Sequence, residues 1–260
     1  MIIVISDLAS IHPEAKIAGN VTVEPFAVIE ADVEIGEGSV IYSHACILSG
    51  SRLGKNCRVF QGAVIAGIPQ DLKFEGEYSQ VIIGDNTTVR ECATINRGTK
   101  AFGKTILGRD CLIMANVHIA HDCILNDHVI LVNNVALAGH VEIGDWSIIG
   151  GLSAVHQFVK VGPHVMVGGG SLVRKDVPPF ITVAREPLSY EGVNVLGLRR
   201  RGYKNSRIEE IHHAYRLVYQ SRLNTTQAIS QIEIEVNESP EIADILKFLR
   251  ASDRGIVKNL

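Results

Sequence analysis

The chain has 260 residues, of which 46% are hydrophobic, 20% are charged and only 5% are aromatic. This length and apolar content suffice for one large or two smaller folded domains, which excludes a disordered chain, and the few aromatic residues exclude a thick aromatic core. Because 28 acidic residues outnumber 25 basic ones, for a net charge of -3, the composition argues against a nucleic-acid partner.

Membrane insertion and export are also disfavoured. No stretch reaches the roughly 18 consecutive apolar residues of a membrane span, and the start Met1-Ile2-Ile3-Val4-Ile5 lacks the basic residues that open a signal peptide. The five cysteines include no C-x-x-C pair and are typical of reduced, small buried side chains: Cys46, Cys57, Cys92, Cys111 and Cys123. We therefore expect a cytoplasmic protein without a membrane span.

A six-residue repeat dominates the chain. Stepping by six from Ile11 to Val173 gives 28 positions, of which 25 are Ile, Val or Leu. This period fits neither an amphipathic helix nor uninterrupted two-residue alternation, so it predicts short strands separated by turns. The three exceptions are Asp71, Glu77 and Ala101, in segments 68–80 and 98–104, which we expect to be loops outside the repeat.

The repeat resembles the left-handed parallel β-helix of hexapeptide-repeat proteins. There, three hexads form a coil of 18 residues, and coils stack at the strand spacing of about 4.8 Å. Only the resemblance gives the hand, because parallel crossovers are normally right-handed. The small residues Cys57, Cys111 and Cys123 precede aliphatic positions by two, which predicts inert thiols inside the prism.

The pattern changes near the C-terminus. The repeat stops at Asp176-Val177-Pro178-Pro179, and from about Gly192 the sequence turns helical. Ser206-x-x-Glu209 predicts a capping box, and Ser239-Pro240 predicts a helix cap with proline at the first helical position. We thus expect a β-helical domain over residues 1–185 and a helical domain over residues 186–260.

Histidines mark the candidate chemistry. Four lie close together in the repeat: His118, His121, His140 and His156. Since residues 18 apart stack on adjacent coils, His121, Gly139 and Gln157 form one column. A histidine base beside a glycine N–H suits acyl transfer, because the N–H stabilises the developing oxyanion. Asp122 is the candidate partner that fixes the histidine tautomer, although neighbours on a strand normally point to opposite faces.

Two other interpretations of the histidines stay open. They are either solvated side chains on the outside of the prism or zinc ligands, as in the γ-class carbonic anhydrases of the same fold. The spacing His118-x-x-His121 differs from the H-x-x-x-x-H of that family, so we expect no metal.

A basic segment lies between residues 199 and 222. It holds seven basic residues, Arg199, Arg200, Arg201, Lys204, Arg207, Arg216 and Arg222, against Glu209 and Glu210. This is either a solvated helix face or a docking surface for phosphates or an acidic protein.

Longer motifs identify a family. They are Asn116-Val117-His118-Ile119-Ala120-His121-Asp122-Cys123, Leu137-Ala138-Gly139-His140, Ala154-Val155-His156-Gln157-Phe158, and Gly192-Val193-Asn194 through Arg200-Arg201-Gly202. With them, nearly the whole chain resembles bacterial UDP-N-acetylglucosamine 3-O-acyltransferases. The resemblance implies transfer of a 3-hydroxyacyl chain from acyl carrier protein to the 3-hydroxyl of UDP-GlcNAc, the first step of lipid A synthesis.

The same resemblance implies roles for individual residues. His121 is the general base, Asp122 its partner and the Gly139 N–H the oxyanion donor. The residues matching substrate-binding positions are Gln70, Asp71, Lys73, His118, His140, His156, Gln157, Asn194, Arg200 and Arg201. Gly169 matches the position that limits acyl length, and its lack of a side chain implies a chain of roughly fourteen carbons or more. The family is a homotrimer with sites between subunits and no cofactor, because phosphopantetheine arrives on the carrier protein.

The chain departs from the family pattern at Leu196, where an acidic residue is typical, at Asn96, where histidine is common, and in the segment 184–187. Recognition of the uracil, and the choice between UDP-GlcNAc and a 3-amino analogue, therefore stay open. Two other functions also stay open: a hexapeptide acetyltransferase using acetyl-CoA, and a non-catalytic β-helical scaffold. The N-acylating enzyme of the pathway is disfavoured, because the repeat begins by Ile11 and leaves no room for a uridine-binding domain before it.

Overall fold

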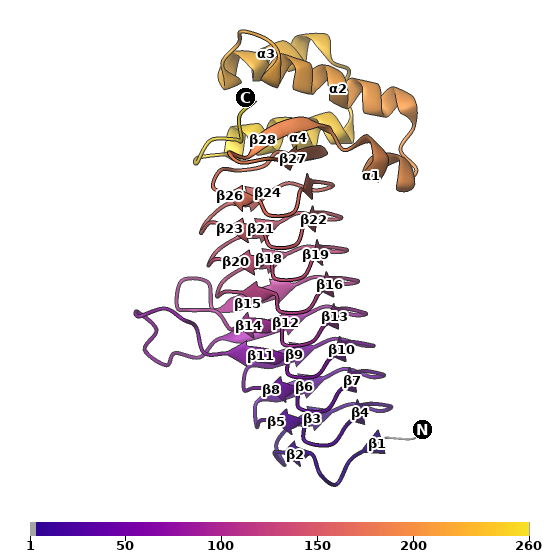
Figure 1. Cartoon of the computed structure of the whole chain (residues 1–260), viewed down its shortest axis with the longest axis vertical. Helices are drawn as coiled ribbons and strands as arrows, with labels where there is room; N and C mark the ends of the chain where they lie inside the picture. Colours follow the sequence, from indigo (N-terminus) through magenta and orange to yellow (C-terminus); the bar gives the residue numbers. More distant parts are fainter. Residues whose placement is uncertain (1–3, 260) are drawn as a thin grey trace.

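A computed structural model describes residues 4–259, which form a tall prism with a group of helices at one end (Figure 1). Residues 1–3, on which the expected lack of a signal peptide partly rests, lie outside the described residues. The prism is a left-handed parallel β-helix, which confirms the fold predicted from the repeat.

Within residues 4–259 the strands form three sheets, one for each side of the prism. The first sheet contains, in spatial order, β1 (Val4–Ile5), β4 (Thr22–Val23), β7 (Val40–Ile41), β10 (Arg58–Val59), β13 (Thr88–Val89), β16 (Leu112–Ile113), β19 (Ile130–Leu131), β22 (Ile148–Ile149), β25 (Met166–Val167), β27 (Ile181–Ala184) and β28 (Ser189–Val193). The second contains β2 (Ser10–Ile11), β5 (Val28–Ile29), β8 (Cys46–Ile47), β11 (Val64–Gly67), β14 (Thr94–Asn96), β17 (His118–Ile119), β20 (Ala136–Leu137), β23 (Ala154–Val155) and β26 (Leu172–Val173). The third contains β24 (Lys160–Val161), β21 (Glu142–Ile143), β18 (Ile124–Leu125), β15 (Lys104–Leu107), β12 (Gln80–Ile83), β9 (Ser51–Leu53), β6 (Val33–Ile35) and β3 (Lys16–Ile17).

The aliphatic position of each hexad points into the prism. Ile119 pairs with Leu137, eighteen residues on, and both side chains are buried. Since each hexad sends its aliphatic position inward, the interior is a stack of aliphatic layers, which explains the low aromatic content.

The corners between sides need residues that tolerate a left-handed backbone. Asp110, Asn116 and His128 sit there with φ between 56° and 60°, a conformation in which short polar side chains bond locally and offset the strain. The coils also approach closely at glycine, because a Cβ on Gly36 would lie 2.4 Å from the Gly54 carbonyl oxygen.

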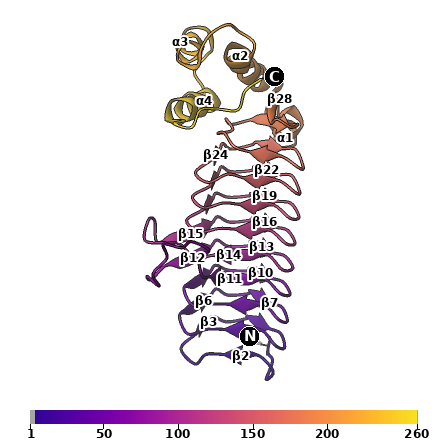
Figure 2. The same cartoon turned by 60° about the vertical axis from the view of Figure 1, so that its left-hand side comes forward.

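The two expected loops leave the coil, as predicted, and project from one side of the prism (Figure 2). One spans residues 68–79, between β11 and β12, and the other spans residues 97–103, between β14 and β15. Across them Ile65 pairs with Ile95, and Ile83 pairs with Leu107. The pairing partners are 30 and 24 residues apart, so the loops add whole hexads and the aliphatic frame is kept.

The coil ends one strand later than the proline pair indicated. Val177 bridges to Val161, β27 pairs in parallel with β25, and β28 then pairs antiparallel with β27. The coil can continue past the proline pair because Pro179 packs against Gly162. A Cβ on Gly162 would lie 2.6 Å from the Pro179 nitrogen, so only glycine leaves room for the proline. The predicted domain boundary at residue 185 falls inside the β27–β28 hairpin and stays a prediction.

Four helices follow within the described residues, and none of them is long and apolar enough to cross a membrane: α1 (Val195–Arg200), α2 (Asn205–Tyr219), α3 (Thr225–Glu235) and α4 (Pro240–Ala251). The predicted Ser239 cap is confirmed, since its side chain accepts a hydrogen bond from the Ile242 N–H. The predicted capping box at Ser206 is wrong, because α2 already begins at Asn205 and its cap residue makes no side-chain bond. The capping box lies instead on α3, between Asn224 and Gln227.

Two parts of the C-terminal region contact the last coils of the prism: a buried tyrosine of α2 and the segment that follows α4. Tyr215 is fully buried and its hydroxyl donates to the Pro179 carbonyl at 2.6 Å. Ile256 forms a parallel bridge with Asp176, and Arg254 Nη2 donates to the Gln157 carbonyl at 2.9 Å. The segment after α4 therefore returns to the prism beside the histidine column.

The cysteines are all free, but they are not all buried. Cys57, Cys111 and Cys123 lie inside the prism, as predicted, and burial raises the pKa of the Cys123 thiol to about 12. Cys46 is only half-buried, and Cys92 is exposed at a left-handed corner with φ 56°. The expectation of five buried thiols is wrong for these two.

Candidate active site

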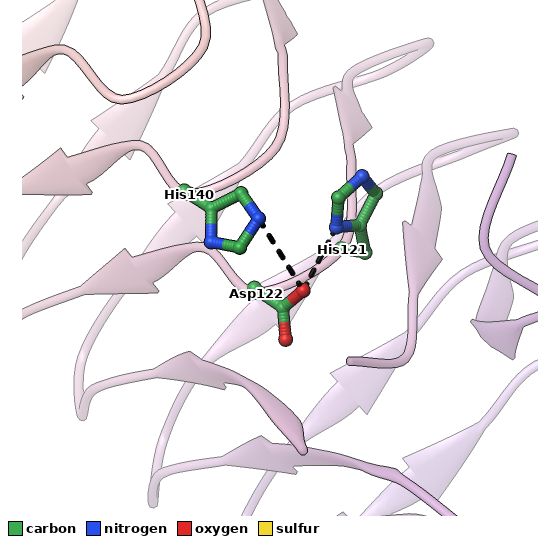
Figure 3. A group of neighbouring side chains, drawn as sticks. All are labelled: His121, Asp122 and His140. Atoms are coloured by element: carbon green, nitrogen blue, oxygen red, sulfur yellow. Dashed lines mark hydrogen bonds and ion pairs between the residues drawn. The ribbon is translucent and has the colours of Figure 1, made fainter. Parts of the chain in front are cut away.

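His121 and Asp122 form a hydrogen-bonded pair at a corner of the prism (Figure 3). The corner lies between β17, which ends at Ile119, and β18, which begins at Ile124. Asp122 has φ 60°, so the two residues do not alternate as on a strand. This turns the carboxylate towards its neighbour, and His121 Nδ1 lies 2.8 Å from Asp122 Oδ2.

The Asp122 carboxylate is wholly buried and is held from a second direction. Thr99, in the loop 97–103, donates its N–H to Oδ1 at 2.9 Å and its hydroxyl to Oδ2 at 2.6 Å. Thr105 Oγ1 accepts from the Asp122 N–H at 2.9 Å. Thr99 was not predicted, because it lies in a loop outside the repeat and no spacing rule connects it to the corner.

Gly139 lies one coil above His121, in the predicted column. The His140 N–H donates to the His121 carbonyl, and the Phe158 N–H donates to the Gly139 carbonyl. A Cβ on Gly139 would lie 2.6 Å from His121 Cε1, so only glycine fits beside the ring. No acceptor within residues 4–259 is bonded to the Gly139 N–H.

His140 completes the group shown in Figure 3. Its ring meets the His121 ring edge-on at 5.2 Å and stacks on Phe158 at 4.6 Å, while its Nε2 lies 3.7 Å from Asp122 Oδ2. Burial lowers the pKa of His140, and His121 lowers it further, although Asp122 and Asp71 act in the opposite direction. Burial therefore favours the neutral form of the His140 ring.

The other two predicted histidines have partners of their own. His118 Nδ1 lies 2.8 Å from Thr94 Oγ1 on the neighbouring strand, and burial lowers the pKa of His118. His156 is exposed, and its Nδ1 lies 3.1 Å from the Gln157 carbonyl oxygen.

The loop 68–79 carries three more predicted residues. Gln70 and Lys73 are exposed, and Asp71 Oδ1 accepts a hydrogen bond from the Lys73 N–H at 3.0 Å. Glu77 Oε1 accepts from the Lys100 N–H at 2.9 Å, which joins this loop to the loop 97–103. The two loops therefore form one structure, in contact with Asp122 through Thr99.

Asn194 uses both polar atoms of its side chain within the chain. Its Oδ1 accepts from the Gly197 N–H at 3.1 Å, which caps α1, and its Nδ2 donates to the His164 carbonyl at 2.9 Å. The sequence motif therefore marks a structural cap, with exposed Leu196 in the first turn of the helix.

The two predicted arginines at the end of α1 differ in their exposure to solvent. Arg200 is exposed, whereas Arg201 lies with its guanidinium 5.3 Å from the Trp146 ring centroid and donates to the Trp146 carbonyl at 2.8 Å. Burial lowers the pKa of Arg201. Arg201 thus joins the prism to the helices, and Arg200 is the arginine of this pair that is open to solvent.

A cleft of about 690 Å³ lies beside the corner, under the segment that follows α4. It is lined by Phe102, Asp122, Ile124, His140, Glu142, Phe158, Lys160, Asp176, Ala251, Asp253 and Arg254. Its lining combines the apolar side chains Phe102, Ile124, Phe158 and Ala251 with seven ionisable ones, so the cleft offers both hydrocarbon contact and polar groups to a ligand.

Comparisons with known proteins identify the family. Residues 176–257 match a model described as UDP-N-acetylglucosamine O-acyltransferase domain 2, and residues 14–49 and 104–139 match bacterial transferase hexapeptide repeats. The acyl-[acyl-carrier-protein]–UDP-N-acetylglucosamine O-acyltransferase of Verminephrobacter eiseniae is 44% identical over 263 residues, covering 96% of this chain and 100% of that protein. The chain belongs to this acyltransferase family.

Solved structures agree with this assignment. The UDP-N-acetylglucosamine acyltransferase of Bacteroides fragilis is 50% identical with a TM-score of 0.96, over 97% of this chain and 99% of that one. The structure from Acinetobacter baumannii is 41% identical with a TM-score of 0.95, over 98% and 100% of the two chains. The predicted family and enzyme class are thus confirmed.

The family site also contains a set of atoms able to bind a metal ion. One ligand atom from each of His121, Asp122 and His140 lies within 4.8 Å of the other two. The Asp122 Oδ2 atom, however, already accepts two hydrogen bonds, from Thr99 and His121. A metal ion bound to His121 Nδ1 would replace the hydrogen bond between His121 and Asp122, and the expectation of a metal-free site stays a prediction.

Proposed function

We propose that this chain transfers a 3-hydroxyacyl group from acyl carrier protein to the 3-hydroxyl of UDP-N-acetylglucosamine, the first step of lipid A biosynthesis. Its membership of the acyltransferase family supports this reaction. The observation that carries the mechanism is the His121 ring, held by Asp122 on one side and facing Gly139 on the other.

His121 acts as the general base. Because Nδ1 donates to Asp122, the ring is held in the tautomer whose Nε2 lone pair is free to accept a proton. Asp122 also stabilises the imidazolium that forms when the sugar hydroxyl is deprotonated. In its neutral form, which burial favours, the His140 ring places no competing positive charge beside the base.

The Gly139 N–H stabilises the oxyanion. As His121 removes the proton from the 3-hydroxyl, the oxygen attacks the thioester carbonyl carbon and the carbonyl oxygen becomes negative. Collapse of this intermediate breaks the C–S bond, and the proton held by His121 passes to the departing phosphopantetheine thiolate. The products are the 3-O-acylated sugar nucleotide and free carrier-protein thiol.

The remaining predicted residues bind substrates. Gln70, Asp71 and Lys73 hold the sugar and its phosphates, while His118, His140, His156 and Gln157 contact the substrates; of these four, His140 lines the cleft beside the corner. Exposed Arg200 binds a phosphate of the nucleotide or of phosphopantetheine. Asn194 and Arg201 also fix α1 against the prism, since the Asn194 amide donates to the His164 carbonyl and Arg201 Nη2 donates to the Trp146 carbonyl.

We further propose a cytoplasmic homotrimer with sites between neighbouring prisms. The enzyme needs no bound cofactor, because phosphopantetheine arrives on the acyl carrier protein. The acyl chain passes Gly169, which is exposed and leaves the groove open to about fourteen carbons or more.

The test is a mass-spectrometric transfer assay with UDP-GlcNAc and either 3-hydroxyacyl carrier proteins of several lengths or acetyl-CoA. We expect a UDP-3-O-(3-hydroxyacyl)-GlcNAc product and a 10²- to 10⁴-fold (order-of-magnitude) loss of rate in His121→Ala. His44→Asn is the control variant, because His44 is stacked on Phe26 in the coils below the loops and asparagine suits its left-handed φ of 60°. Transfer of acetyl groups alone would favour an acetyltransferase, and full activity of His121→Ala would refute the mechanism.

A further inference from the structure

One carboxylate in the site faces two imidazole rings. Asp122 Oδ2 lies 2.8 Å from His121 Nδ1 and 3.7 Å from His140 Nε2, and the two rings stand at 88° to each other (Figure 3). A turn of the carboxylate that brings Oδ2 closer to His140 Nε2 would lengthen its contact with His121 Nδ1. His121 would then lose the partner that fixes its tautomer.

Thr99 holds the carboxylate at two points. Its N–H reaches Oδ1 and its hydroxyl reaches Oδ2, so the two bonds define the plane of the carboxylate. Thr105, the other threonine in contact with this residue, bonds to the Asp122 main chain and leaves the carboxylate free to turn. Within residues 4–259 the orientation of the carboxylate thus depends on Thr99 and His121.

The loop that carries Thr99 is itself rigid. The Thr99 carbonyl accepts from the Phe102 and Gly103 N–H groups, and Thr99 is only 6% exposed. Gly98 packs so closely on the next strand that a Cβ would lie 2.1 Å from the Lys104 nitrogen. The bond between Glu77 and Lys100 then ties this loop to the loop that carries Asp71.

We propose that Thr99 is a positioning residue, which directs the Asp122 carboxylate to His121 and away from His140. This inference rests on the proposed function, in which His121 is the base. Because the two loops are joined, Thr99 also fixes the position of the His121–Asp122 pair relative to the loop that we assign to the sugar nucleotide.

The experiment compares Thr99→Val, which keeps the main-chain N–H but loses the hydroxyl, with Thr99→Ser, which keeps both donors. We expect Thr99→Val to lower kcat by about 10- to 100-fold with little change in the KM for UDP-GlcNAc, because a small displacement of a catalytic group has an effect of this size. Thr99→Ser should restore kcat to within a few-fold. Thr105→Val is the matched control, since it removes a buried hydroxyl bonded to the Asp122 main chain.

Nitrogen-15 NMR of histidine-labelled protein reports the positioning directly. In the unmodified protein His121 should carry its proton on Nδ1, and in Thr99→Val that tautomer should lose population while the His140 signals shift. Thr105→Val should lower the unfolding temperature without this change. Wild-type kcat and an unchanged His121 tautomer in Thr99→Val would overturn the proposal. An inactive unmodified protein with the expected tautomer shift would instead refute the proposed function alone.

Discussion

Gly139→Ala tests whether the space beside the His121 ring is needed for catalysis. A Cβ on Gly139 would lie 2.6 Å from Cε1 and 2.7 Å from Nε2 of His121. Gly139 does not have a positive φ, so alanine is compatible with its backbone. The substitution therefore acts through the side chain of one catalytic residue, and the clash is with a ring and not with the main chain.

The structure gives the size of the displacement. Carbon atoms prefer separations of about 3.5 Å or more, so the ring must retreat by about 1 Å. The bond from Nδ1 to Asp122 Oδ2, now 2.8 Å, would then exceed hydrogen-bonding distance. Since a displacement of about 1 Å costs on the order of 100-fold in rate, we expect kcat to fall by about that factor.

The assay is acyl transfer followed by mass spectrometry, with thermal unfolding measured on the same samples. His121→Ala supplies the control, because removing the ring removes the clash. Gly139→Ala should have almost no further effect on the residual rate of His121→Ala. A wild-type kcat in Gly139→Ala would refute the reasoning. So would a loss of rate in the double variant that equals the product of the losses in the two single variants.

Two more predictions concern the groove and the junction between prism and helices. Gly169→Met should shorten the preferred acyl chain by several carbons if the acyl chain passes this residue as we propose, because the first added atom meets the protein only at Gly151, whose carbonyl oxygen is 3.2 Å away, and the side chain would occupy the path of the acyl chain. An unchanged product profile by mass spectrometry would contradict this. Burial, with Arg201 nearby, lowers the pKa of His164 to about 4 from an ordinary 6.5. The unfolded chain therefore binds more protons between these values, so stability should fall as pH drops from about 6.5 towards 4. The variant His164→Asn keeps a residue that suits the left-handed φ of 58°. Its unfolding temperature should fall less between pH 7 and pH 5 than that of the unmodified protein, and equal falls would show that protonation of His164 does not destabilise the fold.

Much of the fold follows from the sequence because the repeat is strictly local. One aliphatic residue every six positions defines the strands, the interior and the register, and interruptions at Asp71, Glu77 and Ala101 mark the two loops. The same arithmetic stacks Gly139 on His121, since residues 18 apart must be neighbours on adjacent coils. The main elements of the candidate mechanism could therefore be proposed from spacing alone.

Two local predictions, a capping box at Ser206 and a buried Cys92, were wrong because each depends on the exact position of a turn. Ser206 and Glu209 have the spacing of a capping box, but the preceding turn starts α2 at Asn205. Cys92 lies three residues before the aliphatic Ile95, at the corner position of its hexad, whereas Cys57, Cys111 and Cys123 lie two residues before an aliphatic position and point inward. In both cases the position relative to the turn, and not the residue type, determines the environment.

The sequence by itself determined the coil, its aliphatic core and the vertical neighbours in the histidine column, because each depends on a fixed period. Tertiary structure alone decided what surrounds that column. Thr99 reaches Asp122 from a loop, Arg201 packs on Trp146, and Arg254 reaches the Gln157 carbonyl across 97 residues of sequence. These contacts join segments whose separation follows no repeat, so they depend on where the loops and the C-terminal helices fold back onto the prism.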